Sequence, residues 1–194
     1  PEEWPATNWN MITRDATDSQ FTPEQAKALI ADIKKQTSSP ITRIVVTHPN
    51  PDKFNGLAVF HQAGVESIAS ASTAAAIPGV DAYKRYFWVK MAKAFTDETY
   101  PKVEPIKTTF KGKQVIKLKS GENINLIELP KPGISSTQTV VRIDKSGDLI
   151  VGDLAHTRHH TWLEGGIVDG KPTPDLAGWK ADLKVLPTLG KGKV

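Results

Sequence analysis

The chain has 194 residues, 39% of them hydrophobic and 24% charged, which predicts a single globular domain over residues 1–194 rather than a disordered chain. The formal charge of +4 reflects a modest excess of basic residues without an arginine-rich tract, so no nucleic-acid partner is expected, and no apolar run is long enough to span a membrane. The sequence contains no cysteine, which excludes disulfides, thiolate catalysis and cysteine-ligated zinc.

The N-terminal part shows its first clear pattern at the start of a helix. A short strand is expected over residues 9–13, and the rest of residues 1–19 has no assignable pattern. Thr22 can cap a helix that has proline in its first position, and Gln25 can complete a capping box. Apolar residues follow at helical spacing, so a helix with one buried face is predicted to end near Gln36.

A strand, a helix and a second strand follow. Residues 42–47 predict a buried strand, residues 54–63 a helix, and residues 65–69 another strand. Two strands joined by a helix imply parallel pairing through a crossover. The polar residues between the first strand and the helix are therefore expected at the carboxyl end of a parallel strand, where open α/β sheets commonly bind ligands.

The second half of the chain changes from a helical to an alternating pattern. Residues 81–99 predict a long helix whose aromatic stripe faces the core, with a substrate-binding lid as the alternative. Antiparallel hairpins follow, the first with a turn at residues 111–113. The predicted strands are residues 106–110, 115–118, 124–129, 139–143 and 149–151. A final helix is expected from Thr173 until Pro187 and Gly190 end it, so the order predicts an α/β fold of sheets covered by helices.

The stretch Thr47 to Gly56 reads T-H-P-N-P-D-K-F-N-G. It resembles the T-H-x-H-x-D-H-x-x-G metal motif of the metallo-β-lactamase-fold hydrolases. Residues 20–194 also follow the order of that family: a helix, the motif, hairpins, an L-P-x-P-G segment, a V-G-D segment and a last helix. The resemblance implies a four-layer αββα metallo-β-lactamase-like sandwich, with the first hairpin shortened or missing and the last strand expected beyond Val194.

The family builds two neighbouring zinc sites, which activate water for hydrolysis. The resemblance places His48 at the first ligand of the first site. Asn50 replaces the second histidine of that site, and Ile134 stands where the third would be. Because an aliphatic side chain cannot bind zinc, the first site keeps one ligand of three.

The second site keeps its carboxylates and loses an imidazole. Asp52 matches one ligand, and Asp153 in the V-G-D segment resembles the bridging aspartate. Lys53 replaces a histidine, and its ammonium would repel a zinc dication at this site. The resemblance thus implies remnant metal ligands at His48, Asp52 and Asp153, with Asp52 as the catalytic carboxylate if the site is active. Neither set reaches the three or four ligands that zinc needs.

Lys53 suggests a constructive alternative to a metal. Its ammonium could occupy the place of the lost cation and neutralise Asp52 and Asp153, which would otherwise repel each other. Each residue also has a purely structural interpretation. His48 could be a hydrogen-bonded buried histidine, Asp153 could stabilise a loop, and Asp52 adjoins a helix N-terminus, where a carboxylate is favourable without metal.

A second histidine cluster lies in residues 155–162. The segment 159–163 resembles a family segment that borders the mouth of the active site, so His160 and Trp162 join His48, Asn50, Lys53 and Ile134 as predicted cleft residues. His156 and His160 are four residues apart and could share a metal on a helix. A surface loop that lines the cleft is the favoured alternative.

We therefore expect a divergent member of the family with degenerate zinc sites, non-catalytic or ligand-binding, without a cofactor and with an unidentified small molecule as its partner. The alternative is a metal-dependent hydrolase of an ester, thioester, lactone or lactam, with zinc at an altered mononuclear site. Open sheet edges predict a homodimer. The compartment stays open, because a cytoplasmic protein and an exported one after signal removal share these features.

Overall fold

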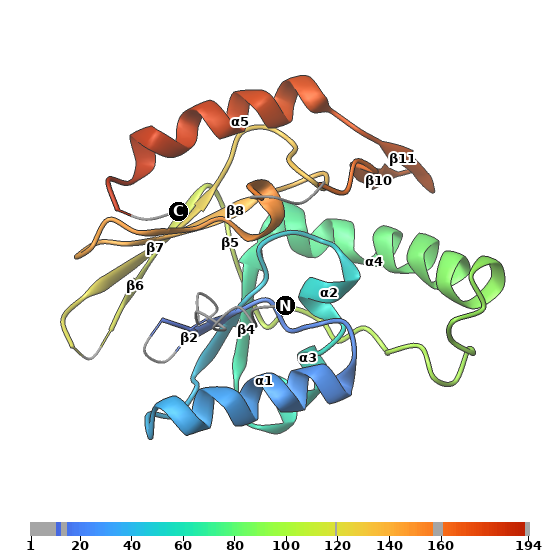
Figure 1. The fold of residues 1–194 in the computed structure, drawn as a ribbon, viewed down its shortest axis with the longest axis horizontal. Coiled ribbons are helices and arrows are strands. Elements are labelled where there is room, and N and C mark those ends of the chain that lie inside the picture. The colour runs from blue at the N-terminus through green and yellow to red at the C-terminus, as the bar shows by residue number, and fades with distance from the viewer. Residues whose placement is uncertain (1–10, 13–14, 119, 157–160, 193–194) are drawn as a thin grey trace, which may run out of the picture.

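The computed structural model describes residues 11–12, 15–118, 120–156 and 161–192. Within them the strands form a five-stranded sheet, a four-stranded sheet and a separate two-stranded hairpin. Helices cover the outer faces of the two larger sheets, which gives the four-layer αββα arrangement expected from the sequence (Figure 1). None of the helices in this described part is long and apolar enough to cross a membrane.

The five-stranded sheet is mostly parallel. Its strands, in spatial order, are β1 (Met11–Ile12), β2 (Asp15–Thr17), β3 (Arg43–Val45), β4 (Glu66–Ser70) and β5 (Thr108–Phe110). The parallel pairing of β3 with β4 confirms the predicted crossover. β2 and β5 extend the parallel set, and β1 pairs antiparallel with β2. Among the described residues, β1 and β2 thus form a first hairpin, so that hairpin is not missing.

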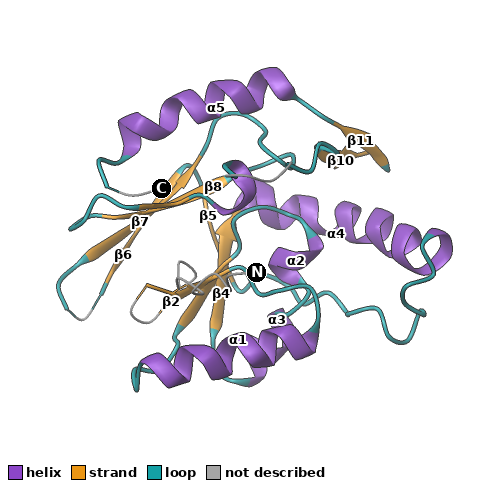
Figure 2. Cartoon of the chain, viewed as in Figure 1, coloured by secondary structure: helices purple, strands orange, loops and turns teal. Residues whose placement is uncertain are grey.

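Three helices follow the early strands of this sheet: α1 (Pro23–Gln36), α2 (Pro51–Phe54) and α3 (Leu57–Gln62). The capping box predicted for α1 is present, because Gln25 N donates to Thr22 Oγ1 at 3.3 Å and Thr22 N donates to Gln25 Oε1 at 3.1 Å. The predicted helix over residues 54–63 is divided between α2 and α3. α1 and α3 lie on the outer face of the sheet (Figure 2).

The prediction for the next helix had the wrong boundaries. α4 (Ala71–Arg85) begins ten residues before Asp81 and continues as a π-helix, η1 (Tyr86–Met91), so residues 92–99 are not helical. Ser70 caps α4 by accepting a hydrogen bond from Thr73 N at 3.1 Å. The helix passes through Pro78 because its alanine-rich first half favours helix and its buried face packs into the core.

The four-stranded sheet is an antiparallel meander. Its strands are β6 (Lys113–Lys117), β7 (Asn123–Glu128), β8 (Thr139–Ile143) and β9 (Leu149–Ile150). The predicted β6–β7 and β8–β9 hairpins are confirmed. The hairpin predicted around residues 111–113 is wrong, because β5 pairs with β4 in the other sheet. The chain crosses there from one sheet to the other, with Gly112 at φ +64°.

The C-terminal part contains a hairpin that the sequence analysis missed, β10 (Gly166–Val168) with β11 (Lys171–Thr173). The last helix, α5 (Leu176–Leu189), begins later than predicted, because Asp175 caps it by accepting from Gly178 N at 2.8 Å. α5 also continues past Pro187. Pro187 lacks the N–H that would donate within the helix, and burial of the neighbouring Leu186 at 5% exposure offsets that loss.

Three apolar clusters fill the three interfaces between the four layers. Ile44 packs with the helices below the five-stranded sheet, whereas its neighbour Val45 packs between the two sheets. Val141 also belongs to the cluster between the sheets, and Val140 faces Trp179 of α5. Side chains alternate between the faces of a strand, so each strand that is buried on both sides contributes to two clusters.

Candidate functional site

The motif predicted at the carboxyl end of a strand lies there in the structure. β2 and β3 are adjacent and parallel, so the residues that follow them meet at one edge of the sheet. Asp18 directly follows β2, and its N–H donates to Val45 O at 2.8 Å. The motif from Thr47 to Gly56 follows β3 and leads into α2, whose N-terminal cap is Asn50.

The loop after β2 docks closely on the motif. Ser19 Oγ donates to Lys53 O at 2.9 Å and accepts from Gly56 N at 3.0 Å. A Cβ on residue 56 would lie 1.9 Å from Ser19 O, so the close approach requires glycine. The motif glycine therefore serves to seat the loop that carries Asp18.

The second sheet supplies Asp153. This residue lies in a 3-10 helix, η2 (Gly152–Leu154), directly after β9. Thr139 N at the start of β8 donates to Thr47 O at 2.7 Å and ties the two sheets together at the site. Gly152 has φ +55°, and a Cβ there would lie 2.9 Å from Thr47 Oγ1. The close approach of Gly152 to Thr47 places the next residue, Asp153, beside the motif, with its Oδ2 3.6 Å from His48 Nε2.

Lys53 lies at the centre of the site and is only 7% exposed. Its Nζ is 2.7 Å from Asp52 Oδ2, 2.9 Å from Asp153 Oδ2 and 3.9 Å from Asp18 Oδ2. Burial favours the neutral amine, but the three carboxylates outweigh it and raise the pKa of Lys53 above its usual range. Burial likewise opposes ionisation of Asp153, and Lys53 nevertheless holds the pKa of that carboxyl below its usual range. The ammonium contacts both Asp52 and Asp153, as hypothesised from the sequence.

Asp18 is one of the site residues that the sequence did not indicate. Thr47 N donates to Asp18 Oδ1 at 2.9 Å, and Thr47 Oγ1 lies 3.0 Å from both carboxylate oxygens. Burial raises the pKa of Asp18 to about 7, although Lys53 and the hydrogen bonds from Thr47 oppose this shift. The β2 strand before it has only three residues, too few for a periodic pattern to identify.

His48 is fully buried, and its two ring nitrogens have different surroundings. Nδ1 lies 3.0 Å from Thr47 Oγ1, while Nε2 has no hydrogen-bond partner among the described residues. Burial and the nearby Lys53 ammonium lower the pKa of His48 to about 4, so the imidazole is neutral at pH 7. With Asp18 ionised, Thr47 donates to it and accepts from Nδ1–H, which assigns the unprotonated nitrogen to Nε2.

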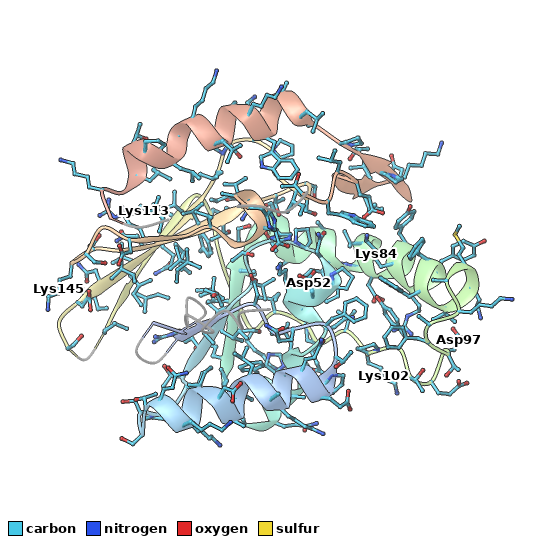
Figure 3. All side chains as sticks on the ribbon, in the orientation of Figure 1. Asp52, Lys84, Asp97, Lys102, Lys113 and Lys145 are labelled. Carbon is cyan, nitrogen blue, oxygen red and sulfur yellow. The ribbon has the colours of Figure 1, made fainter. Side chains whose placement is uncertain are left out.

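A pocket of about 250 Å³ opens beside these groups. It is lined by Phe21, Asn50, Pro51, Asp52, Lys84, Trp88, Ile134, Asp153 and Trp162. The predicted residues Asn50, Asp52, Ile134, Asp153 and Trp162 thus gather around one cavity. Figure 3 shows Asp52 and Lys84 on the neighbouring elements α2 and α4.

The remaining predicted residues have other placements. His48 and Lys53 are buried and contact Asp153 without lining this pocket. His160 lies outside the described residues. His156 is exposed and follows η2, which ends at Leu154, so it does not extend that helix. His61, which the sequence analysis did not consider, contacts Ser67 Oγ at 2.9 Å, away from the pocket-lining residues.

Comparison with known proteins identifies the family of this chain. A family model described as the metallo-beta-lactamase superfamily matches residues 17–193. The chain therefore belongs to the metallo-beta-lactamase superfamily.

Two solved structures illustrate the structural similarity. A metallo-beta-lactamase from Pontibacter korlensis is 19% identical with a TM-score of 0.64, and the match covers 92% of this chain and 71% of that one. The metallo-beta-lactamase FIM-1 from Pseudomonas aeruginosa, crystallised in its mono-zinc form, is 20% identical with a TM-score of 0.60. That match covers 90% of this chain and 65% of the FIM-1 chain. At these identities the similarity establishes the fold alone.

The described residues do not fit a zinc ion. Zinc takes four ligands in structural sites and at least three protein ligands in catalytic ones, at about 2.0 to 2.3 Å. In the described part of the chain, no group of three or more His, Asp or Glu side chains is arranged to hold a metal. The Lys53 ammonium contacts both Asp52 and Asp153, and Ile134 is 3% exposed in an apolar cluster with Leu154. With Lys53 in this position, a dication would have to displace an ammonium of the same sign.

Proposed function

We propose that the protein is a non-catalytic, ligand-binding member of the superfamily, in which the Lys53 ammonium replaces a metal cation. The observation that carries this proposal is the position of Lys53 Nζ, 2.7 Å from Asp52 and 2.9 Å from Asp153. An ammonium offsets one of the two carboxylate charges, but it has no open coordination position for a water molecule. Metal-bound water is what gives this kind of site a nucleophile at neutral pH.

The chemistry of the other site residues supports the same proposal. Asp52 is the candidate catalytic carboxylate, and its Oδ2 is held in an ion pair with Lys53 Nζ at 2.7 Å. Asn50 and Ile134, at the positions of two family histidines, cannot act as general bases at neutral pH. The pocket itself is retained at about 250 Å³, with polar and aromatic side chains in its walls. A cavity whose carboxylates Asp52 and Asp153 are held in ion pairs with Lys53 is suited to binding rather than turnover.

Elemental analysis and a hydrolysis screen test this proposal. The protein, purified without a histidine tag, is expected to contain less than stoichiometric metal and to leave ester, thioester, lactone and lactam substrates intact. A variant that combines Asn50→His, Lys53→His and Ile134→His restores the three imidazoles of the family motif and serves as the positive control for zinc uptake. Stoichiometric metal in the natural sequence, with turnover that a chelator abolishes, would overturn the proposal and favour the altered mononuclear hydrolase.

A further inference from the structure

The pocket beside Asp52 has aromatic side chains from three separate segments of the chain. We call it the aromatic pocket, and its rings are Phe21 before α1, Trp88 in η1 and Trp162 before β10. Carboxylates of Asp52 and Asp153 line the same cavity. An apolar ligand would be bound by the aromatic side chains alone, so the carboxylates indicate a ligand that carries a charge or a hydrogen-bond donor.

The aromatic walls are held in place by their own contacts. The Phe21 and Trp88 ring centroids are 5.6 Å apart at an interplanar angle of 71°, an edge-to-face arrangement. Phe95 packs against both rings, and its ring centroid is 5.6 Å from that of Phe21 and 6.4 Å from that of Trp88. Trp88 belongs to the π-helix, a rare conformation that is frequent at functional sites. Trp162 is fixed differently, because its Nε1 donates to Glu164 Oε2 at 3.0 Å.

The charges around the aromatic pocket do not balance. Lys84 Nζ is paired with the Glu164 carboxylate, so that ammonium has its own counterion. Lys53 is instead shared among Asp52, Asp153 and Asp18, as the distances above show. One ammonium therefore faces three carboxylates, and an excess of negative charge remains even when Asp18 is protonated.

Lys84 in the wall of the aromatic pocket and His48 behind it bear on the charge that a ligand would meet. The Lys84 ammonium lies 5.3 Å from the centroid of the Trp162 ring, a cation–π distance, so this ring already accepts an ammonium in the protein itself. His48 Nε2 is fully buried, has no hydrogen-bond partner among the described residues, and faces Asp153. An anionic ligand would meet the carboxylates of Asp52 and Asp153 and would be repelled.

We propose that the aromatic pocket binds a small organic cation, such as a quaternary ammonium group or a protonated amine. Aromatic faces attract a cation through their quadrupole, and the carboxylates supply the opposite charge. The volume of about 250 Å³ is below the usual range of roughly 300–1,000 Å³ for drug-sized ligands, which favours a compact head group. This inference rests on the proposed function, since a metal held by Asp52 and Asp153 would remove the excess negative charge.

Calorimetric titration with a matched pair of ligands tests the inference. Choline and its neutral carbon analogue 3,3-dimethylbutan-1-ol have the same shape and differ in charge. The titrations contain a chelator, so that no metal contributes to binding. Choline is expected to bind at least about tenfold more tightly than the alcohol. Equal affinities, tighter binding of the alcohol, or no choline binding up to millimolar concentration would overturn the inference.

Two pairs of variants locate the binding. Trp162→Ala is expected to weaken choline binding about fivefold or more, and Leu163→Ala is its control, since both side chains are 56% exposed and Leu163 does not line the aromatic pocket. Asp52→Asn is expected to weaken it as well. Its control is Asp97→Asn, an exposed carboxylate that pairs with Lys90 at 2.6 Å. Affinity that is unchanged in Trp162→Ala would overturn the inference.

Melting temperatures and metal content separate the other outcomes. Trp162 is largely exposed, so Trp162→Ala is expected to have the same melting temperature as the natural protein. This variant therefore reports on binding even if Asp52→Asn is less stable. Metal content and hydrolysis are measured separately without chelator. Stoichiometric metal with turnover overturns the proposed function, whereas a metal-free protein that does not prefer choline overturns only the organic-cation inference.

Discussion

Replacing Lys53 with methionine tests the ion-pair network at the centre of the site. Methionine keeps most of the side-chain length and removes the charge together with the N–H donors. The change leaves Asp52, Asp153 and Asp18 without the ammonium that lies 2.7, 2.9 and 3.9 Å from them. Three carboxylates that share one cation would then repel one another across the junction of the two sheets.

The size of the effect follows from the exposure of each carboxylate. Breaking a fully buried ion pair by removing one partner costs about 3–5 kcal/mol of unfolding free energy. The Asp52 side chain is 44% exposed and can turn toward water, which lowers this value. Asp153 at 26% and Asp18 at 11% have less access to water. We therefore expect Lys53→Met to lose about 2–4 kcal/mol at pH 7.

The loss should depend on pH in a defined direction. Lys53 holds the pKa of Asp153 below its usual value in the folded protein, so this ionised carboxylate stabilises the fold above the unfolded pKa of about 3.9. That contribution disappears as the pH falls through the folded pKa. A protonated carboxyl needs no counterion, so the difference between Lys53→Met and the natural protein should be largest at neutral pH and should shrink toward pH 3.

Urea denaturation followed by circular dichroism at pH 7 and at acidic pH measures these differences. Lys90→Met is the matched control, because its ammonium pairs with Asp97 at 2.6 Å but is 56% exposed, and its loss should stay below about 1 kcal/mol. Adding Asp153→Asn to Lys53→Met should recover part of the lost stability. The reasoning fails if Lys53→Met loses no more than the control, or if the double variant is less stable than Lys53→Met.

Three further predictions concern the fold around the site. Gly56→Ala should cost about 3 kcal/mol, since its Cβ would lie 1.9 Å from Ser19 O, whereas Gly79→Ala, with open space at its Cβ, should be neutral or stabilising in thermal denaturation. Thr22→Ala should remove the capping box and cost about 1 kcal/mol in urea, and an unchanged midpoint would contradict that role. Burial raises the pKa of Asp182 to about 6, so its ionisation destabilises the fold as the pH rises from about 4 to 6. The stability of Asp182→Asn relative to the natural protein should therefore rise across that interval, and a pH-independent difference would refute this.

Features set by neighbouring residues could be predicted from the sequence. The capping box at Thr22, the crossover around the motif and the hairpins β6–β7 and β8–β9 depend on side chains within a few positions of one another. The resemblance placed Asp52, Lys53 and Asp153 at one site. Because an ammonium between two carboxylates reduces their repulsion, the contact of Lys53 with both could be predicted. The pairing of Lys53 with Asp52 needed only the motif, because the two residues are adjacent.

Long-range features were decided by the tertiary structure. No local pattern indicates that β5 pairs with β4 and not with β6. A turn at Gly112 is compatible both with a hairpin and with a crossing from one sheet to the other. The early start of α4 also depends on packing, because burial of its apolar face offsets the hydrogen bond that is missing at Pro78.

Asp18 shows the same limit at the site itself. It lies 29 residues before Thr47 in the chain and meets it only because β2 and β3 are paired in parallel. The sequence determined which charged groups the motif contains. The packing of two sheets determined that three carboxylates surround one buried ammonium, since burial and distance depend on contacts between segments far apart in the chain.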